Sequence, residues 1–154
     1  MMNLCSDVLQ ALKGKTLATA ESCTGGGIGA ALTAVPGASK VYVGGVVSYT
    51  NDVKYRVLGV EQAVLDQYGA VSAPVAGAMA SGVRNLMQAD VAVSVTGLAG
   101  PGGDNFGNAV GTVCIGYADK RQRLAKQYHF YGARDEIREQ AVRAAVELVL
   151  EVNS

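Results

Sequence analysis

The sequence is poor in the residues on which metal sites and disulfide frameworks depend. Its 154 residues include a single histidine, His129, and only three cysteines, Cys5, Cys23 and Cys114, with no CxxC pair among them. A multi-histidine metal site cannot be built, and neither a structural zinc site nor a disulfide framework is expected. A reducing cytoplasm is the compartment that best fits this cysteine usage.

Charge is also scarce. Charged residues make up 17% of the chain, and 13 basic residues balance 13 acidic ones. Binding to nucleic acid needs a concentrated positive face, so we expect no nucleic-acid partner. No apolar run approaches the roughly 18 residues of a membrane span, and no signal-peptide pattern opens the chain, so we expect no membrane partner.

Hydrophobic residues make up 49% of the chain, which excludes an intrinsically disordered protein. The length predicts a single domain over residues 1–154 that buries a core without disulfides. Glycine is the outlier, because 20 of the 154 residues are glycine, roughly twice the average share of about 7%. The glycines cluster at 25–27 and 97–103, where they indicate tight turns or close approach of a ligand.

Hydrophobic periodicity predicts helices that alternate with strands. We expect strands over residues 15–20, 41–49, 91–96, 110–117 and 124–131. We expect helices over residues 4–12, 28–35, 61–68 and 133–152, a short helix capped by Asn51, and a longer one opened by Ser72 and Pro74 with Val75, Met79, Val83, Leu86 and Met87 facing inward.

The character of these strands predicts the fold class. The strand at 91–96 is nearly all apolar, which is typical of a buried central strand. The polar turn at 119–122 joins two strands into an antiparallel hairpin. The sequence therefore predicts an α/β protein, a single three-layer α/β/α domain with a mixed sheet.

The first candidate site is the run AESCTGGG at residues 20–27, which follows a strand and opens a helix. Free N–H groups at that position can hold a phosphate or an oxyanion, and Ser22, Cys23 and Thr24 offer two hydroxyls and a thiol. Taken alone, the pattern favours Ser22 or Thr24 as a helix cap, whereas the adjacent glycines favour function. The run also fits a dinucleotide fingerprint from Gly25, but the acidic residue expected about 20 positions later is missing, so chance explains that match better.

The second candidate is SYTNDVK at residues 48–54, with Tyr49 at a strand end and Lys54 in the first turn of the next helix. A helix N-terminus disfavours a cation, and partial burial lowers a lysine pKa further, so Lys54 could serve as a neutral base. The alternative is a solvated surface lysine. His129 lies in an alternating strand and is interpreted as structural, which favours a Ser–Lys over a Ser–His arrangement. Cys23 is an alternative nucleophile without an obvious base.

The third candidate is TGLAGPGG at residues 96–103, which leaves the most buried-looking strand. Ligands of α/β folds bind outside the carboxyl ends of strands. The run lacks the Lys-Ser/Thr of a P-loop, so NTP hydrolysis is not indicated. A flexible surface loop is the alternative, but so many glycine and proline residues directly after a core strand favour binding.

Several motifs, in this order, resemble the CinA C-terminal domain family over nearly the whole chain. They are AESCTGG from residue 20, VPGAS from 35, GVVSYTN from 45 with Lys54, GAVS from 69, VTGLAGPGG from 95, VGTV from 110 and RD-x-IR from 134. The resemblance implies a CinA C-terminal-like fold. It also implies a nicotinamide-nucleotide amidase, which converts nicotinamide mononucleotide to nicotinate mononucleotide and ammonia in pyridine nucleotide salvage.

The resemblance also implies residue roles. The catalytic serine, tyrosine and lysine of the family fall on Ser22, Tyr49 and Lys54. Ser22 attacks the carboxamide, Lys54 takes the proton, and Tyr49 relays the proton or holds Lys54, while N–H groups at the start of the helix after Gly25 receive the oxyanion. The expected substrate-binding residues are Thr24, Gly25, Gly26, Gly45, Thr96, Gly97, Ala99 and Gly100. No metal or cofactor is needed, and we expect a homo-oligomer.

Three departures from the family pattern stand out. Asn108-Ala109 replaces a usual Lys-Pro, Gly27 replaces a commonly larger residue, and Asp52-Val53 stands where Glu-Ala is more usual. The family's amino-terminal domain has no counterpart here, so its activities are not carried over. Two alternatives remain open: a non-catalytic nucleotide-binding domain, and an NAD-dependent oxidoreductase inferred from the glycine fingerprint.

Overall fold

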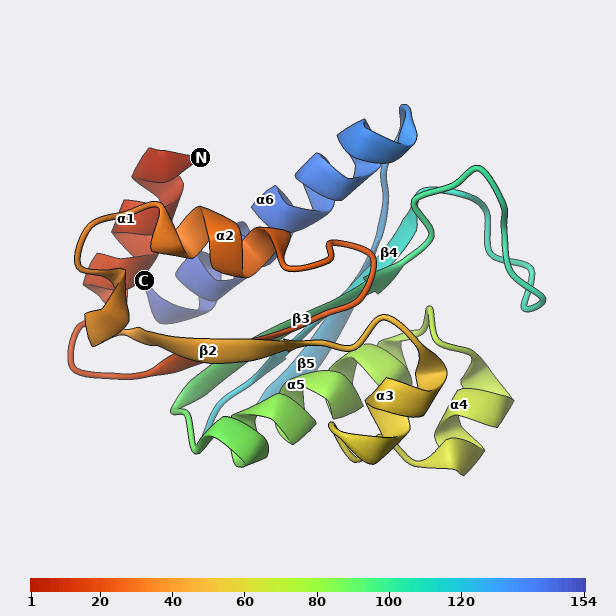
Figure 1. The fold of residues 1–154 in the computed structure, drawn as a ribbon, viewed down its shortest axis with the longest axis horizontal. Helices are drawn as coiled ribbons and strands as arrows, with labels where there is room; N and C mark the ends of the chain where they lie inside the picture. The colour runs from red at the N-terminus through yellow and green to blue at the C-terminus, as the bar shows by residue number, and fades with distance from the viewer.

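A five-stranded mixed sheet organises the chain, as the computed structural model of residues 1–154 shows (Figure 1). Its strands are β1 (Leu17–Glu21), β2 (Tyr42–Val47), β3 (Val91–Gly97), β4 (Thr112–Ala118) and β5 (Arg123–His129), in the order β2-β1-β3-β4-β5. β1 is parallel to β2 and β3, whereas β4 is antiparallel to β3 and β5. The predicted central strand and antiparallel hairpin are confirmed.

Helices cover both faces of the sheet, which confirms the three-layer prediction (Figure 1). One layer contains α1 (Met2–Ala11), α2 (Gly27–Thr33) and α6 (Arg134–Asn153), and the other contains α3 (Asn51–Arg56), α4 (Gln62–Tyr68) and α5 (Ala73–Met87). A short 3-10 helix over Ala38–Lys40 precedes β2. None of the helices combines the length and the apolar composition that crossing a membrane requires.

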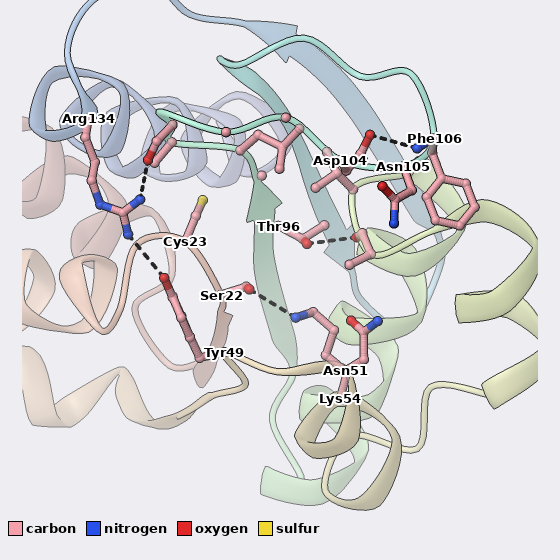
Figure 2. Close-up of a pocket in the computed structure, with 18 residues that line it drawn as sticks. Ser22, Cys23, Tyr49, Asn51, Lys54, Thr96, Asp104, Asn105, Phe106 and Arg134 are labelled. Carbon is pink, nitrogen blue, oxygen red and sulfur yellow. Dashed lines mark hydrogen bonds between the residues drawn. The ribbon is translucent and has the colours of Figure 1, made fainter.

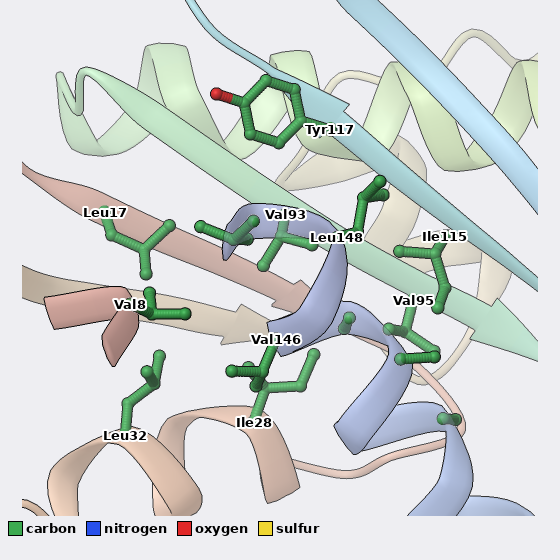
Figure 3. Packing of buried hydrophobic residues seen from close by; sticks show 14 of the residues in the cluster. Val8, Leu17, Ile28, Leu32, Val93, Val95, Ile115, Tyr117, Val146 and Leu148 are labelled. Carbon is green, nitrogen blue, oxygen red and sulfur yellow. The ribbon is translucent and has the colours of Figure 1, made fainter. Parts of the chain in front are cut away.

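The two faces of the sheet bury cores of different character. On the α1, α2 and α6 face the core is made of large aliphatic side chains, among them Val8, Leu17, Ile28, Val93, Val95, Ile115 and Leu148 (Figure 3). On the opposite face the sheet presents Ala18, Ala20 and Ala92 to α5. Successive residues of a strand point to opposite faces, so the small residues lie on the side where α5 packs against β1 and β3.

Two local predictions were wrong. Thr50, rather than Asn51, caps α3, because Thr50 has extended backbone geometry and its hydroxyl accepts the N–H of Val53. Leu86 is 52% exposed although Val75, Met79 and Val83 are fully buried, because in the last turn of α5 only Met87 still packs against the core.

The carboxyl ends of the three parallel strands meet at one edge of the sheet. The N–H of Ser22, just after β1, donates to the carbonyl of Val95 in β3, and the N–H of Ser48, just after β2, donates to the carbonyl of Glu21. From this edge the chain enters α2 on one face and α3 on the other. Such a divergence leaves a crevice at the carboxyl ends, where ligands of α/β sheets bind.

The packing of α5 against the loop after α3 generates a test of the fold. A Cβ added at Gly82 would collide with the backbone carbonyl of Leu58, whereas one added at Gly77, in the same helix, would meet only the mobile end of the Arg123 side chain. We expect Gly82→Ala to lower the free energy of unfolding by about 2 kcal/mol and Gly77→Ala to change it by less than about 1 kcal/mol. Urea denaturation of both variants measures this, and equal effects would contradict the assigned contact.

Candidate active site

Ser22 and Lys54 form a buried pair at the carboxyl edge of the sheet (Figure 2). Nζ of Lys54 lies 3.0 Å from Oγ of Ser22, and it donates a hydrogen bond of 2.9 Å to the carbonyl of Ser48. Ser22 is 8% exposed and Lys54 1% exposed. The alternative of a solvated surface lysine is therefore wrong.

Ser48 links the two members of the pair. Its N–H donates to the carbonyl of Glu21, the residue before Ser22, at 2.7 Å, and its hydroxyl lies 3.4 Å from the same oxygen. Its own carbonyl accepts the amine of Lys54. The alignment of serine and lysine is thereby tied to the parallel pairing of β1 and β2.

Burial sets the protonation of Lys54. It lowers the pKa of the amine from 10.5 to about 8, and no carboxylate forms an ion pair with this lysine. About one amine in ten is then neutral at pH 7. The expected helix-dipole contribution was wrong, because α3 has only six residues and Lys54 lies in its last turn, where a cation is favoured.

Neither rival to the Ser–Lys pair has suitable surroundings. Cys23 is next to Ser22, but burial raises the pKa of its thiol to about 11, so the reactive thiolate is scarce at neutral pH. His129 is an exposed residue of the edge strand β5, where its ring packs edge-on against Tyr131, and it does not line the cavity at Ser22.

The N-terminus of α2 already holds a carboxylate of the protein itself. Glu21 is 2% exposed, and its side chain accepts the N–H groups of Ile28 at 2.9 Å and Gly29 at 3.0 Å and the hydroxyl of Thr24 at 2.6 Å. Neither Ser22 nor Thr24 caps the helix, whose N-cap residue is Gly26. A dinucleotide would place its pyrophosphate on the N–H groups at this helix N-terminus. Glu21 already accepts the N–H groups of Ile28 and Gly29, so they are not available for that role.

A cavity of about 460 Å³ opens above the pair. Of the residues predicted from the sequence, it brings together Ser22, Tyr49, Lys54, Thr96, Gly97, Ala99 and Gly100. The predicted substrate-binding residues Thr24, Gly25, Gly26 and Gly45 do not line the cavity. Thr24 is bound to Glu21, and Gly45 lies where any Cβ would collide with the backbone of β1.

Tyr49 lines the cavity but has a different partner from the one expected. Its hydroxyl lies 3.1 Å from the guanidinium of Arg134, which also donates to the carbonyl of Gly100 at 2.6 Å (Figure 2). No hydrogen bond joins Tyr49 to Lys54, which is held by Ser48 instead. Sequence reasoning missed Arg134 as a cation of the site, although it begins the RD-x-IR motif.

The glycine-rich loop after β3 forms a further part of the cavity wall, next to Arg134. The N–H groups of Ala99, Gly100, Gly102 and Gly103 have no acceptor within the protein. Unpaired backbone donors beside an arginine are suited to an anion. Asn108, which stands where the family has lysine, does not enter the cavity lining; its side-chain amide donates to Asp104 at 2.7 Å and to the carbonyl of Val71 at 3.2 Å.

The chain is similar in sequence to known proteins of one family. A family model described as the CinA C-terminal domain matches residues 1–153. A CinA-like protein of Geobacter metallireducens is 54% identical over 125 residues, which are 81% of this chain and 30% of that protein. A putative competence-damage inducible protein of Caldanaerobacter subterraneus is 46% identical over 137 residues, 89% of this chain and 33% of that protein. The chain thus spans about a third of the length of these relatives.

Solved structures agree with the fold. The competence damage-inducible protein A of Klebsiella pneumoniae has a TM-score of 0.95 and 37% identity, with 97% of this chain and 94% of that chain covered. A CinA superfamily protein of Escherichia coli has a TM-score of 0.96 and 38% identity, with 98% and 89% covered.

The buried amine generates a prediction about stability. Because the pKa of Lys54 is lower in the folded than in the unfolded chain, the unfolded chain binds more protons between pH 8 and 10.5, and stability rises with pH over that interval. We expect the free energy of unfolding of the wild type, relative to Lys54→Met, to increase by up to about 3 kcal/mol from pH 7 to pH 10.5. Denaturation of both proteins at several pH values measures this, and a pH-independent difference would contradict the depressed pKa.

Proposed function

This chain belongs to the CinA C-terminal domain family, and from that premise we propose that it hydrolyses the carboxamide of nicotinamide mononucleotide to nicotinate mononucleotide and ammonia. The observation that carries the proposal is the buried Ser22–Lys54 pair, with 3.0 Å between Oγ and Nζ at the floor of a cavity. A hydroxyl beside a partly neutral amine is the arrangement that an amidase needs to generate a nucleophile without histidine.

In the first step Oγ of Ser22 attacks the carboxamide carbon, and the proton of Ser22 moves to the neutral amine of Lys54. The carbonyl of Ser48 holds that amine in place during the transfer. The ammonium of Lys54 then returns the proton to the amide nitrogen as the C–N bond breaks, and ammonia leaves. Water, deprotonated by the same amine, hydrolyses the acyl-enzyme.

The negative oxygen of the tetrahedral intermediate needs donors close to Ser22. The N–H groups of Ile28 and Gly29 are engaged by Glu21, so the helix N-terminus cannot supply them as first expected. The N–H groups of Cys23 and Thr24, next along the chain from Ser22, donate to no backbone carbonyl, and that of Cys23 lies beside its own thiol. We assign the oxyanion to the N–H of Cys23, because Cys23 lines the cavity, whereas Thr24 does not, and because it directly follows the nucleophile, as in other serine hydrolases.

The 5′-phosphate of the substrate is assigned to the end of the cavity that carries Arg134. A guanidinium recognises phosphate through several parallel donors, and Tyr49 and the carbonyl of Gly100 fix its orientation. The unpaired N–H groups of Ala99 and Gly100 lie in the same wall. Tyr49 is therefore proposed to act through Arg134 rather than through Lys54.

We propose pyridine nucleotide salvage in the cytoplasm by a homo-oligomer that uses no metal or cofactor. The three cysteines are buried and unpaired, as a reducing compartment permits. A non-catalytic nucleotide-binding domain is the alternative, and release of ammonia from nicotinamide mononucleotide by the purified protein separates the two.

The nucleophile is tested by two neighbouring substitutions. Ser22→Ala should reduce amide hydrolysis by at least about a thousandfold, because the attacking oxygen is lost. Cys23→Ala should retain activity within about threefold, because the protonated thiol takes no part. Ammonia release is measured for both, with circular dichroism to establish that each is folded. Wild-type turnover by Ser22→Ala would overturn the mechanism.

The base is tested by pH and by a charge-preserving substitution. We expect kcat/KM to rise with pH through an apparent pKa of about 8, the value for Lys54, because only the neutral amine accepts the proton of Ser22. Lys54→Arg should be inactive across this range, since arginine keeps its proton at any working pH. If Lys54→Arg retained near wild-type turnover, Lys54 would be an electrostatic residue and another base would have to be found.

A further inference from the structure

The cavity has opposite charges at its two ends. Its lining contains one carboxylate, that of Asp104, and two basic groups, those of Lys54 and Arg134. Figure 2 shows Arg134 at one end and Asp104 at the other, with the Ser22–Lys54 pair between them. At pH 7 most of the Lys54 amines are still charged, so Asp104 is the one negative group among the charges that line the cavity.

The carboxylate of Asp104 is held in one orientation. One of its oxygens accepts the N–H groups of Phe106 and Asn108, each at 3.0 Å, and the other accepts the side-chain amide of Asn108 at 2.7 Å. Partial burial opposes ionisation, but these hydrogen bonds outweigh it and hold the pKa of Asp104 below its usual value. The carboxylate is therefore a fixed negative charge at working pH.

The loop that carries Asp104 is anchored on Gly69 and Val71, in the segment between α4 and α5. Within the loop, the side-chain amide of Asn108 donates to the carbonyl of Val71 at 3.2 Å; the strand before it is fixed by Thr96 of β3, whose hydroxyl donates to the carbonyl of Ala70 at 2.8 Å. The ring of Phe106 lies so close to Gly69 that no Cβ fits there. The contacts of Asn108 and Phe106 hold the loop against the segment before α5, so the Asp104 carboxylate stays at its end of the cavity lining.

We propose that Asp104 is a specificity-determining residue that selects substrates with a cationic ring. The inference rests on the proposed function. Nicotinamide mononucleotide is a zwitterion, with an anionic phosphate and a cationic pyridinium, and it matches the cavity when the phosphate faces Arg134 and the ring faces Asp104. A ring that bears no charge, as in the reduced dihydropyridine form, loses this attraction while it keeps the phosphate.

Binding is tested without turnover in the Ser22→Ala background by calorimetry with nicotinamide mononucleotide and its reduced form. With Asp104 present, the oxidised form should bind roughly fivefold more tightly, as expected for the attraction between opposite charges in a partly solvated site. In Asp104→Asn that ratio should fall to about one, through weaker binding of the oxidised form alone. Raised ionic strength should shrink the ratio in the same direction.

The controls separate charge from loop structure. Asp119→Asn is matched, because Asp119 also accepts the N–H groups of two turn residues and a side-chain donor, but in the β4–β5 turn outside the cavity; it should leave the ratio unchanged. Asp104→Ser removes the charge and keeps an acceptor for the turn, so it should act as Asp104→Asn does if the latter fails to fold.

Two results would overturn the inference: an unchanged ratio in the uncharged variants, or equal weakening of both ligands, which is what a purely structural role produces. Failure of the proposed function is recognised separately, because the wild type would then release no ammonia from nicotinamide mononucleotide. If ammonia is released and the ratio stays unchanged, only the role of Asp104 is lost.

Discussion

The removal of one amine from water is the constraint on which the rest of the site depends. Burying a charged group without an opposite charge is costly, and a lysine responds by giving up its proton more easily. Lys54 is enclosed almost completely, with a hydroxyl and a carbonyl as its polar partners and no carboxylate. An ion pair would stabilise the ammonium and remove the base, so the absence of a neighbouring acid is itself a chemical feature of the site.

The sheet supplies the alignment that this amine requires. Ser22 continues β1 and is hydrogen-bonded to β3, Ser48 continues β2 and is hydrogen-bonded to Glu21, and Lys54 follows on α3. Errors in strand register would move the hydroxyl and the amine apart, because each is attached to a different strand. Groups held by paired strands are more precise than groups on a free loop, which suits a proton transfer over hydrogen-bond distance.

Because the carboxylate of Glu21 occupies the N-terminus of α2, a ligand anion must bind elsewhere. A helix N-terminus attracts negative charge, and here the protein satisfies it with a buried side chain. Under the proposed function, anion recognition therefore falls to Arg134 and to the free donors of the loop after β3. In that loop Asp104, Phe106 and Asn108 form a hydrogen-bonded turn, and Asn108-Ala109 stands where the family pattern has Lys-Pro, so one of the three departures from the family pattern lies in this wall.

The sequence by itself determined the layers and the strand boundaries to within a few residues, because hydrophobic periodicity records which face of each element is buried. Its family resemblance singled out Ser22 and Lys54 as candidates, and the structure places the two side chains 3.0 Å apart. The sequence also indicated the glycine-rich segments 25–27 and 97–103 as binding loops. It could not show that only the second lines the cavity, while Glu21 binds the helix N-terminus that follows the first. Only the tertiary structure decided that burial, not the helix dipole, lowers the pKa of Lys54, that Tyr49 contacts Arg134, and that Asp104 is the one carboxylate of the cavity. Solvent exclusion and contacts between residues distant in sequence arise when several elements pack together, and no local pattern encodes them.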